Sequence, residues 1–199
     1  MNKFARSVCL GSALVVSACG GSEQVEGEEL AQQSARLLTA SSQGCDYSVA
    51  SVQTTPSPPQ YNIVVTRTGG VSCPYPTGVS QVVGTAVLNA PGSLGMVGGS
   101  LGLAVGYVKK NGFSGSSANI YSLVHVDTAT LAVMRNADIL CDYRTGNIIT
   151  GSLSISADGT GVSVFGTKDG KINGQSGTYY SASFVNFFTS TTPPTYFVF

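Results

Sequence analysis

The chain has 199 residues, with ten Lys and Arg against ten Asp and Glu, and charged residues make up only 10% of it, well below the quarter usual in globular proteins. The chain has no excess of positive charge to bind phosphates, which argues against nucleic acid as a partner. Low charge, abundant Ser, Thr and Val, 25 Gly and no Trp are typical of an exported β protein rather than of a helical cytosolic enzyme.

The N-terminal segment 1–18 has the regions of a secretory signal peptide in their usual order: a positively charged start, an apolar run and small residues before a cleavage site. Lys3 and Arg6 provide the positive start, and the run 7–16 that follows is apolar and uncharged. This run is too short to cross the roughly 30 Å hydrocarbon core of a membrane as a helix. The segment is therefore expected to direct export and then to be removed.

The last residues of this segment are Val16-Ser17-Ala18-Cys19, which resemble the lipobox of bacterial lipoproteins. The resemblance implies cleavage between Ala18 and Cys19, acylation of Cys19, and attachment to membrane lipid of the cell envelope. Gly20 stands where lipoproteins of the inner membrane often carry Asp, so the outer membrane is favoured over the inner membrane. The alternative is an ordinary signal peptide cleaved after Ala18, with Cys19 unmodified.

Residues 19–44 differ from the rest of the chain, because they contain four Glu and no aromatic residue. We expect an acidic, solvated tether with a short helix near 28–38; the alternative is a helix that packs on the globular body. The globular domain is then expected over residues 45–199.

Beyond Cys45 apolar and polar residues alternate, the period of a half-buried strand. The pattern predicts about eight or nine short strands, and hence an all-β domain built as an antiparallel β-sandwich or a small barrel. The predicted strands cover 47–54, 61–67, 79–88, 101–109, 118–126, 130–140, 148–157, 161–167 and 178–188. Tight hairpin turns are expected at Asn111-Gly112, Asp158-Gly159 and Asp169-Gly170, because these dipeptides tolerate positive φ.

One of the five Cys leaves with the signal peptide and one is acylated, so Cys45, Cys73 and Cys141 remain. Export to an oxidising compartment favours one disulfide and one free thiol. If 47–54 and 60–67 form a hairpin, Cys45 and Cys73 come close to opposite each other, which favours that pair. Cys45–Cys141 is the alternative, because both residues begin a Cys-Asp-Tyr triplet.

His125 is the only His, and Asp127 follows two residues later on the same face of a predicted strand, as a base and its orienting carboxylate would. No Gly-x-Ser-x-Gly motif accompanies this pair, and a single His argues against a zinc site. The segments 158–161 and 169–174 resemble calcium loops but lack spaced acidic ligands. No catalytic residue, metal or cofactor is therefore expected.

The stretch 68–108 has no charged residue. It is interpreted as a Gly-rich loop followed by a buried central strand, with a membrane-inserting hairpin as the alternative. The segment 195–199 resembles the closing strand of an outer-membrane barrel, but Pro193-Pro194 leaves only half the length that a membrane strand requires. We expect it to form an edge or closing strand.

The sequence as a whole favours a lipid-anchored envelope protein with a non-enzymatic structural, adhesive or ligand-binding β domain. Its expected partners are membrane lipid, bound through acylated Cys19, and a protein or surface ligand of the envelope. Two alternatives remain: a membrane-acting effector that inserts 68–108, and a hydrolase that uses His125.

Overall fold

The computed structural model describes residues 38–199, and these residues form twelve strands in three four-stranded sheets, all paired antiparallel. The all-β prediction is confirmed. The first sheet contains β1 (Leu38–Ser42), β2 (Cys45–Pro56), β3 (Pro59–Gly69) and β4 (Ser80–Val87); the second contains β5 (Gly92–Gly99), β6 (Gly102–Lys110), β7 (Asn119–Val126) and β8 (Val133–Ile139); the third contains β9 (Ser152–Ile155), β10 (Val162–Thr167), β11 (Tyr179–Phe184) and β12 (Thr195–Val198). The signal peptide, Ala18, Cys19 and nearly all of the helix expected at 28–38 lie outside the described residues.

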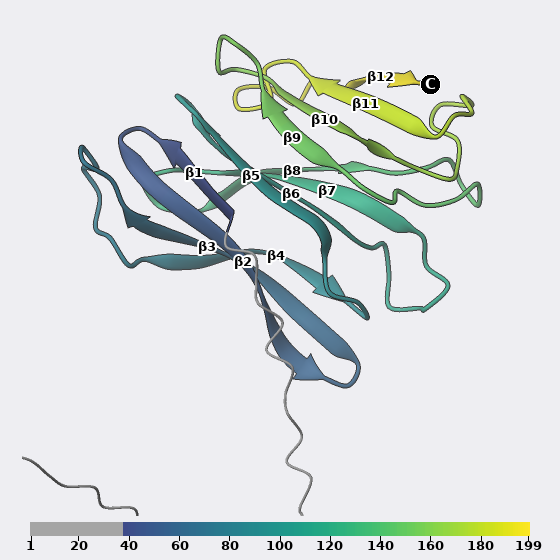
Figure 1. Cartoon of the computed structure of the whole chain (residues 1–199), viewed down its shortest axis with the longest axis horizontal. Coiled ribbons are helices and arrows are strands. Elements are labelled where there is room, and N and C mark those ends of the chain that lie inside the picture. The colour runs from purple at the N-terminus through teal and green to yellow at the C-terminus, as the bar shows by residue number, and fades with distance from the viewer. Residues whose placement is uncertain (1–37) are drawn as a thin grey trace, which may run out of the picture. The chain divides into compact units, whose positions relative to one another are not determined.

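The three sheets are stacked in chain order, with the second sheet between the other two (Figure 1). Each sheet is an open meander of consecutive strands, so the barrel alternative is wrong. One core fills the space between the first and second sheets, and another fills the space between the second and third. An expectation of eight or nine strands was too low, because it omitted β1 and β5 and left 195–199 outside the count.

The second sheet is buried on both faces, which explains the apolar stretches in β6 and β7. Leu103 and Val105 of β6 pack into the core against the first sheet, whereas Ala104 and Val108 pack into the core against the third. Successive residues of a strand point to opposite faces, so a strand between two cores needs apolar residues at odd-numbered and even-numbered positions alike. The predicted buried strand within 68–108 is therefore confirmed as β6.

Glycines in β5 allow its neighbours to approach closely. A Cβ atom at Gly98 would overlap the backbone carbonyl of Ser41 in β1, and one at Gly99 would overlap Ile155 of β9. β5 thus lies against the first sheet on one side and the third sheet on the other. The expected Gly-rich loop is in fact an edge strand, because small residues here permit packing on both sides.

The folded domain begins before Cys45, inside the range assigned to the tether. β1 pairs with β2 from Leu38↔Val49 to Ser42↔Cys45, and Leu38 and Ala40 pack against the first core. Its turn, Gln43-Gly44, has positive φ at both residues. Gln is not a usual residue for this turn, and β1 is short and polar, so the composition resembled a tether.

Two of the three expected tight hairpins are wrong. A loop of residues 111–118 joins β6 to β7, closed by a hydrogen bond from the Asn111 amide to the Ala118 carbonyl. Asp169-Gly170 lies in the long connection between β10 and β11. Asp158-Gly159 does form a turn between β9 and β10, where the Asp158 carboxylate accepts hydrogen bonds from Thr160 and Gly159 has a φ of 73°. Within residues 38–199, no helix has the length and apolar character needed to cross a membrane.

Candidate functional site

Cys45 and Cys73 form a disulfide with a Cα–Cα distance of 4.3 Å, so the favoured pairing is confirmed and Cys45–Cys141 is excluded. The bond ties the start of β2 to the loop after β3. Cys141 is a free, buried thiol, and burial raises its pKa, which lowers its reactivity as a nucleophile.

His125 is held in an apolar contact rather than in a catalytic arrangement. Its ring lies 5.0 Å from the Phe188 ring, edge to face, and burial lowers its pKa. The Asp127 side chain instead stabilises the turn that follows β7. Its carboxylate accepts hydrogen bonds from the amides of Ala129 and Thr130 and from the Thr130 hydroxyl. No hydrogen bond joins His125 to Asp127 within the described chain, so the geometry gives the hydrolase alternative no support.

Arg67 is a buried charge that the sequence did not single out. Its guanidinium donates hydrogen bonds to the carbonyls of Pro76, Thr128 and Ala129, and it lies 5.0 Å from the centre of the Tyr75 ring. These contacts tie β3 to the loop after it and to the turn after β7. The side chain is only 1% exposed, so its role is structural.

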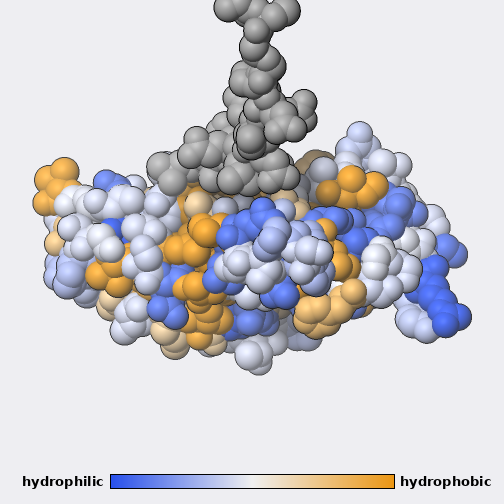
Figure 2. All heavy atoms as spheres, turned by 90° about the horizontal axis from the view of Figure 1, so that it is seen from below, coloured by the Kyte–Doolittle hydropathy of each residue, from blue (hydrophilic) through white to orange (hydrophobic). Residues whose placement is uncertain are grey.

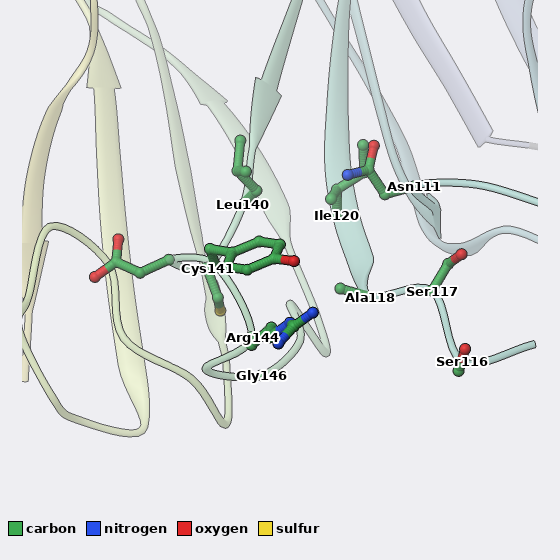
Figure 3. A pocket seen from close by; sticks show the side chains of 11 residues that line it. Asn111, Ser116, Ser117, Ala118, Ile120, Leu140, Cys141, Arg144 and Gly146 are labelled. Atoms are coloured by element: carbon green, nitrogen blue, oxygen red, sulfur yellow. The ribbon is translucent and has the colours of Figure 1, made fainter. Parts of the chain in front are cut away.

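A cavity of about 300 Å³ lies beside Cys141. Figure 3 shows Asn111, Ser116 and Ser117 on one side of it, and Leu140, Cys141 and Arg144 on the other. The Asp142 carboxylate at its rim accepts hydrogen bonds from the amides of Asn173 and Gly174. That carboxylate therefore stabilises a turn, and within the described chain no hydrogen bond joins it to the Cys141 thiol or to the hydroxyls of Ser116 and Ser117.

A second, polar cavity of about 190 Å³ lies between β4 and the second sheet. Lys109, Ser122 and Asp138 line it together with uncharged residues, and the Ser122 hydroxyl donates a 2.6 Å hydrogen bond to Asp138. The described residues contain no group of three or more His, Cys, Asp or Glu side chains placed to hold a metal ion.

The most unusual surface lies on the third sheet, on the side away from the second. Alternate residues of β10 and β11, such as Val164, Tyr180 and Ala182, are buried in the core, so their neighbours point outward. These outward residues are all aromatic or hydroxylic, and we call them the outer face: Ser152, Ser154, Ser163, Phe165, Thr167, Tyr179, Ser181, Ser183, Thr195, Phe197 and Phe199. Exposed aromatic side chains on one face make it a candidate interaction surface.

Three rings of the outer face form one cluster, the aromatic triad. Phe165 lies 6.1 Å from Tyr179, Tyr179 lies 5.9 Å from Phe199, and Phe165 lies 6.0 Å from Phe199, as distances between ring centres. The Tyr179 ring is nearly parallel to both others, at 16° and 19°. All three residues remain between 45% and 61% exposed.

Backbone pairing builds the triad from distant parts of the chain. Tyr179 and Phe199 exchange two backbone hydrogen bonds, which extend the β11–β12 ladder, while β10 brings Phe165 from the other side of β11. The strand predicted at 195–199 is confirmed as edge strand β12, whereas the triad was not predicted. Aromatic residues alternate with other residues in 195–199, and this was the only sequence pattern that pointed to the triad. Which rings come together depends on the register between strands, which the sequence does not reveal.

No family model, curated protein or solved structure matches the chain.

Proposed function

We propose that this protein is a lipid-anchored protein of the bacterial cell envelope, attached by acylated Cys19 to the outer membrane, with a non-enzymatic domain that binds a ligand through the outer face. The observation that carries this proposal is the aromatic triad, exposed among hydroxyl side chains on an open sheet. Full burial of an exposed Phe side chain is favourable by about 1.5–3 kcal/mol, and a partner that covered the three half-exposed rings would gain part of this free energy from each, which favours a binding role.

The anchor is supported by Val16-Ser17-Ala18-Cys19, and an extracytoplasmic location agrees with the Cys45–Cys73 disulfide. The membrane-effector alternative has less support, since β6 is buried between two sheets and would have to leave the core to insert. On the face of the molecule in Figure 2, apolar side chains form small groups separated by polar ones.

The anchor is tested by growing expressing cells with radiolabelled palmitate. We expect label in the wild type and none in Cys19→Ala, because the substitution removes the thiol that accepts lipid. Label of equal intensity in the variant would contradict the lipobox.

The binding role is tested separately with Cys19→Ala protein, which lacks the anchor, mixed with detergent-washed bacterial envelopes and sedimented. We expect the protein to sediment with the envelopes, and a further change of Phe165, Tyr179 and Phe199 together to Ser to leave it in the supernatant. Equal sedimentation of both proteins, or of neither, would contradict a binding role for the outer face.

A further inference from the structure

We propose that the ligand of the outer face is a neutral polysaccharide, held by the packing of its pyranose rings on the aromatic triad. This inference rests on the proposed binding function and names the chemical class of its ligand.

The absence of charged side chains on the outer face favours a neutral ligand. The outer face has no charged side chain, and after Lys171 the sequence contains no charged residue at all. An anionic polymer or an acidic lipid headgroup would lose hydration on this surface without meeting a cation. A ligand without charge avoids that cost.

The aromatic triad matches one side of a sugar ring. The face of an aromatic ring is electronegative, and the axial C–H bonds of a pyranose carry partial positive charge, so the two attract while both lose contact with water. The centres of the three rings lie 5.9–6.1 Å from one another and each residue is about half exposed, so one chain of sugars can contact all three rings.

The surroundings of the triad match the sugar hydroxyls. Ser163, Thr167 and Ser181 flank the rings, and each hydroxyl both donates and accepts a hydrogen bond, as a sugar hydroxyl does. The Thr167 hydroxyl already shares a 2.7 Å hydrogen bond with the Thr150 hydroxyl, but a purely apolar partner would leave the Ser163 and Ser181 hydroxyls without water or any other acceptor, which costs free energy.

The openness of the surface favours a polymer over a small molecule. Neither the cavity beside Cys141 nor the one between β4 and the second sheet includes an outer-face residue. Small ligands are generally enclosed in concave sites. An extended chain lying across β10, β11 and β12 can instead gather contacts along its length.

The experiment uses Cys19→Ala protein and measures co-sedimentation with two insoluble neutral polysaccharides, cellulose and chitin. We expect binding to at least one of them, and Phe165→Ala or Phe199→Ala to weaken it roughly tenfold, the equivalent of 1.4 kcal/mol in the binding free energy. Tyr179→Phe should retain binding, since it keeps the ring. Phe113→Ala is the matched control, because Phe113 is 79% exposed but lies in the β6–β7 loop.

The inference is overturned if neither polymer retains the protein, or if Phe165→Ala binds as well as Phe113→Ala does. Stronger retention on insoluble cross-linked polygalacturonate, an anionic polymer, would also overturn it, as would binding to phosphatidylcholine vesicles in place of polysaccharide. A dimer in light scattering that the triad substitutions dissociate would identify a second copy of the chain as the occupant. If envelope binding still depends on the triad in any of these cases, the proposed function stands and only the ligand class is wrong.

Discussion

Two buried tyrosines differ in whether the hydroxyl group has a hydrogen-bond acceptor. The Tyr47 hydroxyl donates a 3.0 Å bond to the Thr128 carbonyl, whereas the Tyr121 hydroxyl is buried without a partner among the described residues. We expect Tyr47→Phe to lower the free energy of unfolding by about 1 kcal/mol, and Tyr121→Phe to leave it unchanged or raise it by about 1 kcal/mol, because the second change removes an unpaired polar group. Urea unfolding of the two variants checks this, and equal losses in both would contradict it.

His125 makes stability depend on pH. Burial lowers its pKa, the nearby Arg135 lowers it further, and the Leu101 backbone and Asp127 act in the opposite direction. The unfolded chain, with a His pKa of about 6.5, therefore takes up a proton before the folded chain does, so stability is full above that pH and falls as the pH drops below it. We expect the urea midpoint to decrease from pH 7 to pH 5 in the wild type.

The matched variant for this prediction is His125→Leu, which keeps an apolar side chain under Phe188 and removes the titrating group. We expect its midpoint to be flat over the same pH interval. The carboxyl of Asp127, whose pKa is lowered by its hydrogen bonds to Thr130, contributes only at more acidic pH. A decrease of the same size in both proteins would show that another group is responsible.

At the scale of elements, the packing of β5 depends on glycine. A Cβ atom at Gly98 would overlap the carbonyl of Ser41, which is backbone and cannot rotate away, whereas one at Gly69 would have no atom within 4 Å. We expect Gly98→Ala to reduce the free energy of unfolding by about 2–3 kcal/mol and Gly69→Ala to change it by less than about 0.5 kcal/mol. Thermal unfolding of both variants tests this; a Gly98→Ala protein as stable as Gly69→Ala would show that β1 and β5 are farther apart.

Alternation in the sequence located the strands that have one or two well-defined apolar faces, such as β3, β7 and β10. It missed β1, whose residues are short and polar, and β5, whose glycines carry no pattern of hydrophobicity. Both strands are stabilised by what lies beside them rather than by their own composition, so tertiary context outweighs propensity there. The outer face was missed for a related reason, because its rings meet only when three strands pair in register.

At the scale of the whole molecule, each sheet of the described chain consists of consecutive strands, and none of these strands is shared between sheets. The stability of the fold therefore depends on the packing of the three sheets against one another. The disulfide acts within the first sheet, where it closes a loop with a sequence separation of 28 residues. Loop-closure entropy predicts that a cross-link of this span stabilises the fold by about 3.5 kcal/mol. The first sheet packs on the second through Tyr47 and Val49, close to Cys45, so loss of the cross-link is expected to weaken that core as well.

We therefore expect dithiothreitol to lower the urea midpoint of the protein substantially. Cys141→Ala isolates the effect, since it removes the free thiol and leaves the disulfide: its midpoint should fall with reductant as in the wild type. Cys45→Ala/Cys73→Ala should show the lower midpoint with or without reductant. If reductant leaves the midpoint of Cys141→Ala unchanged, the stack of sheets does not depend on the cross-link, and an oxidising compartment is not a condition for its stability.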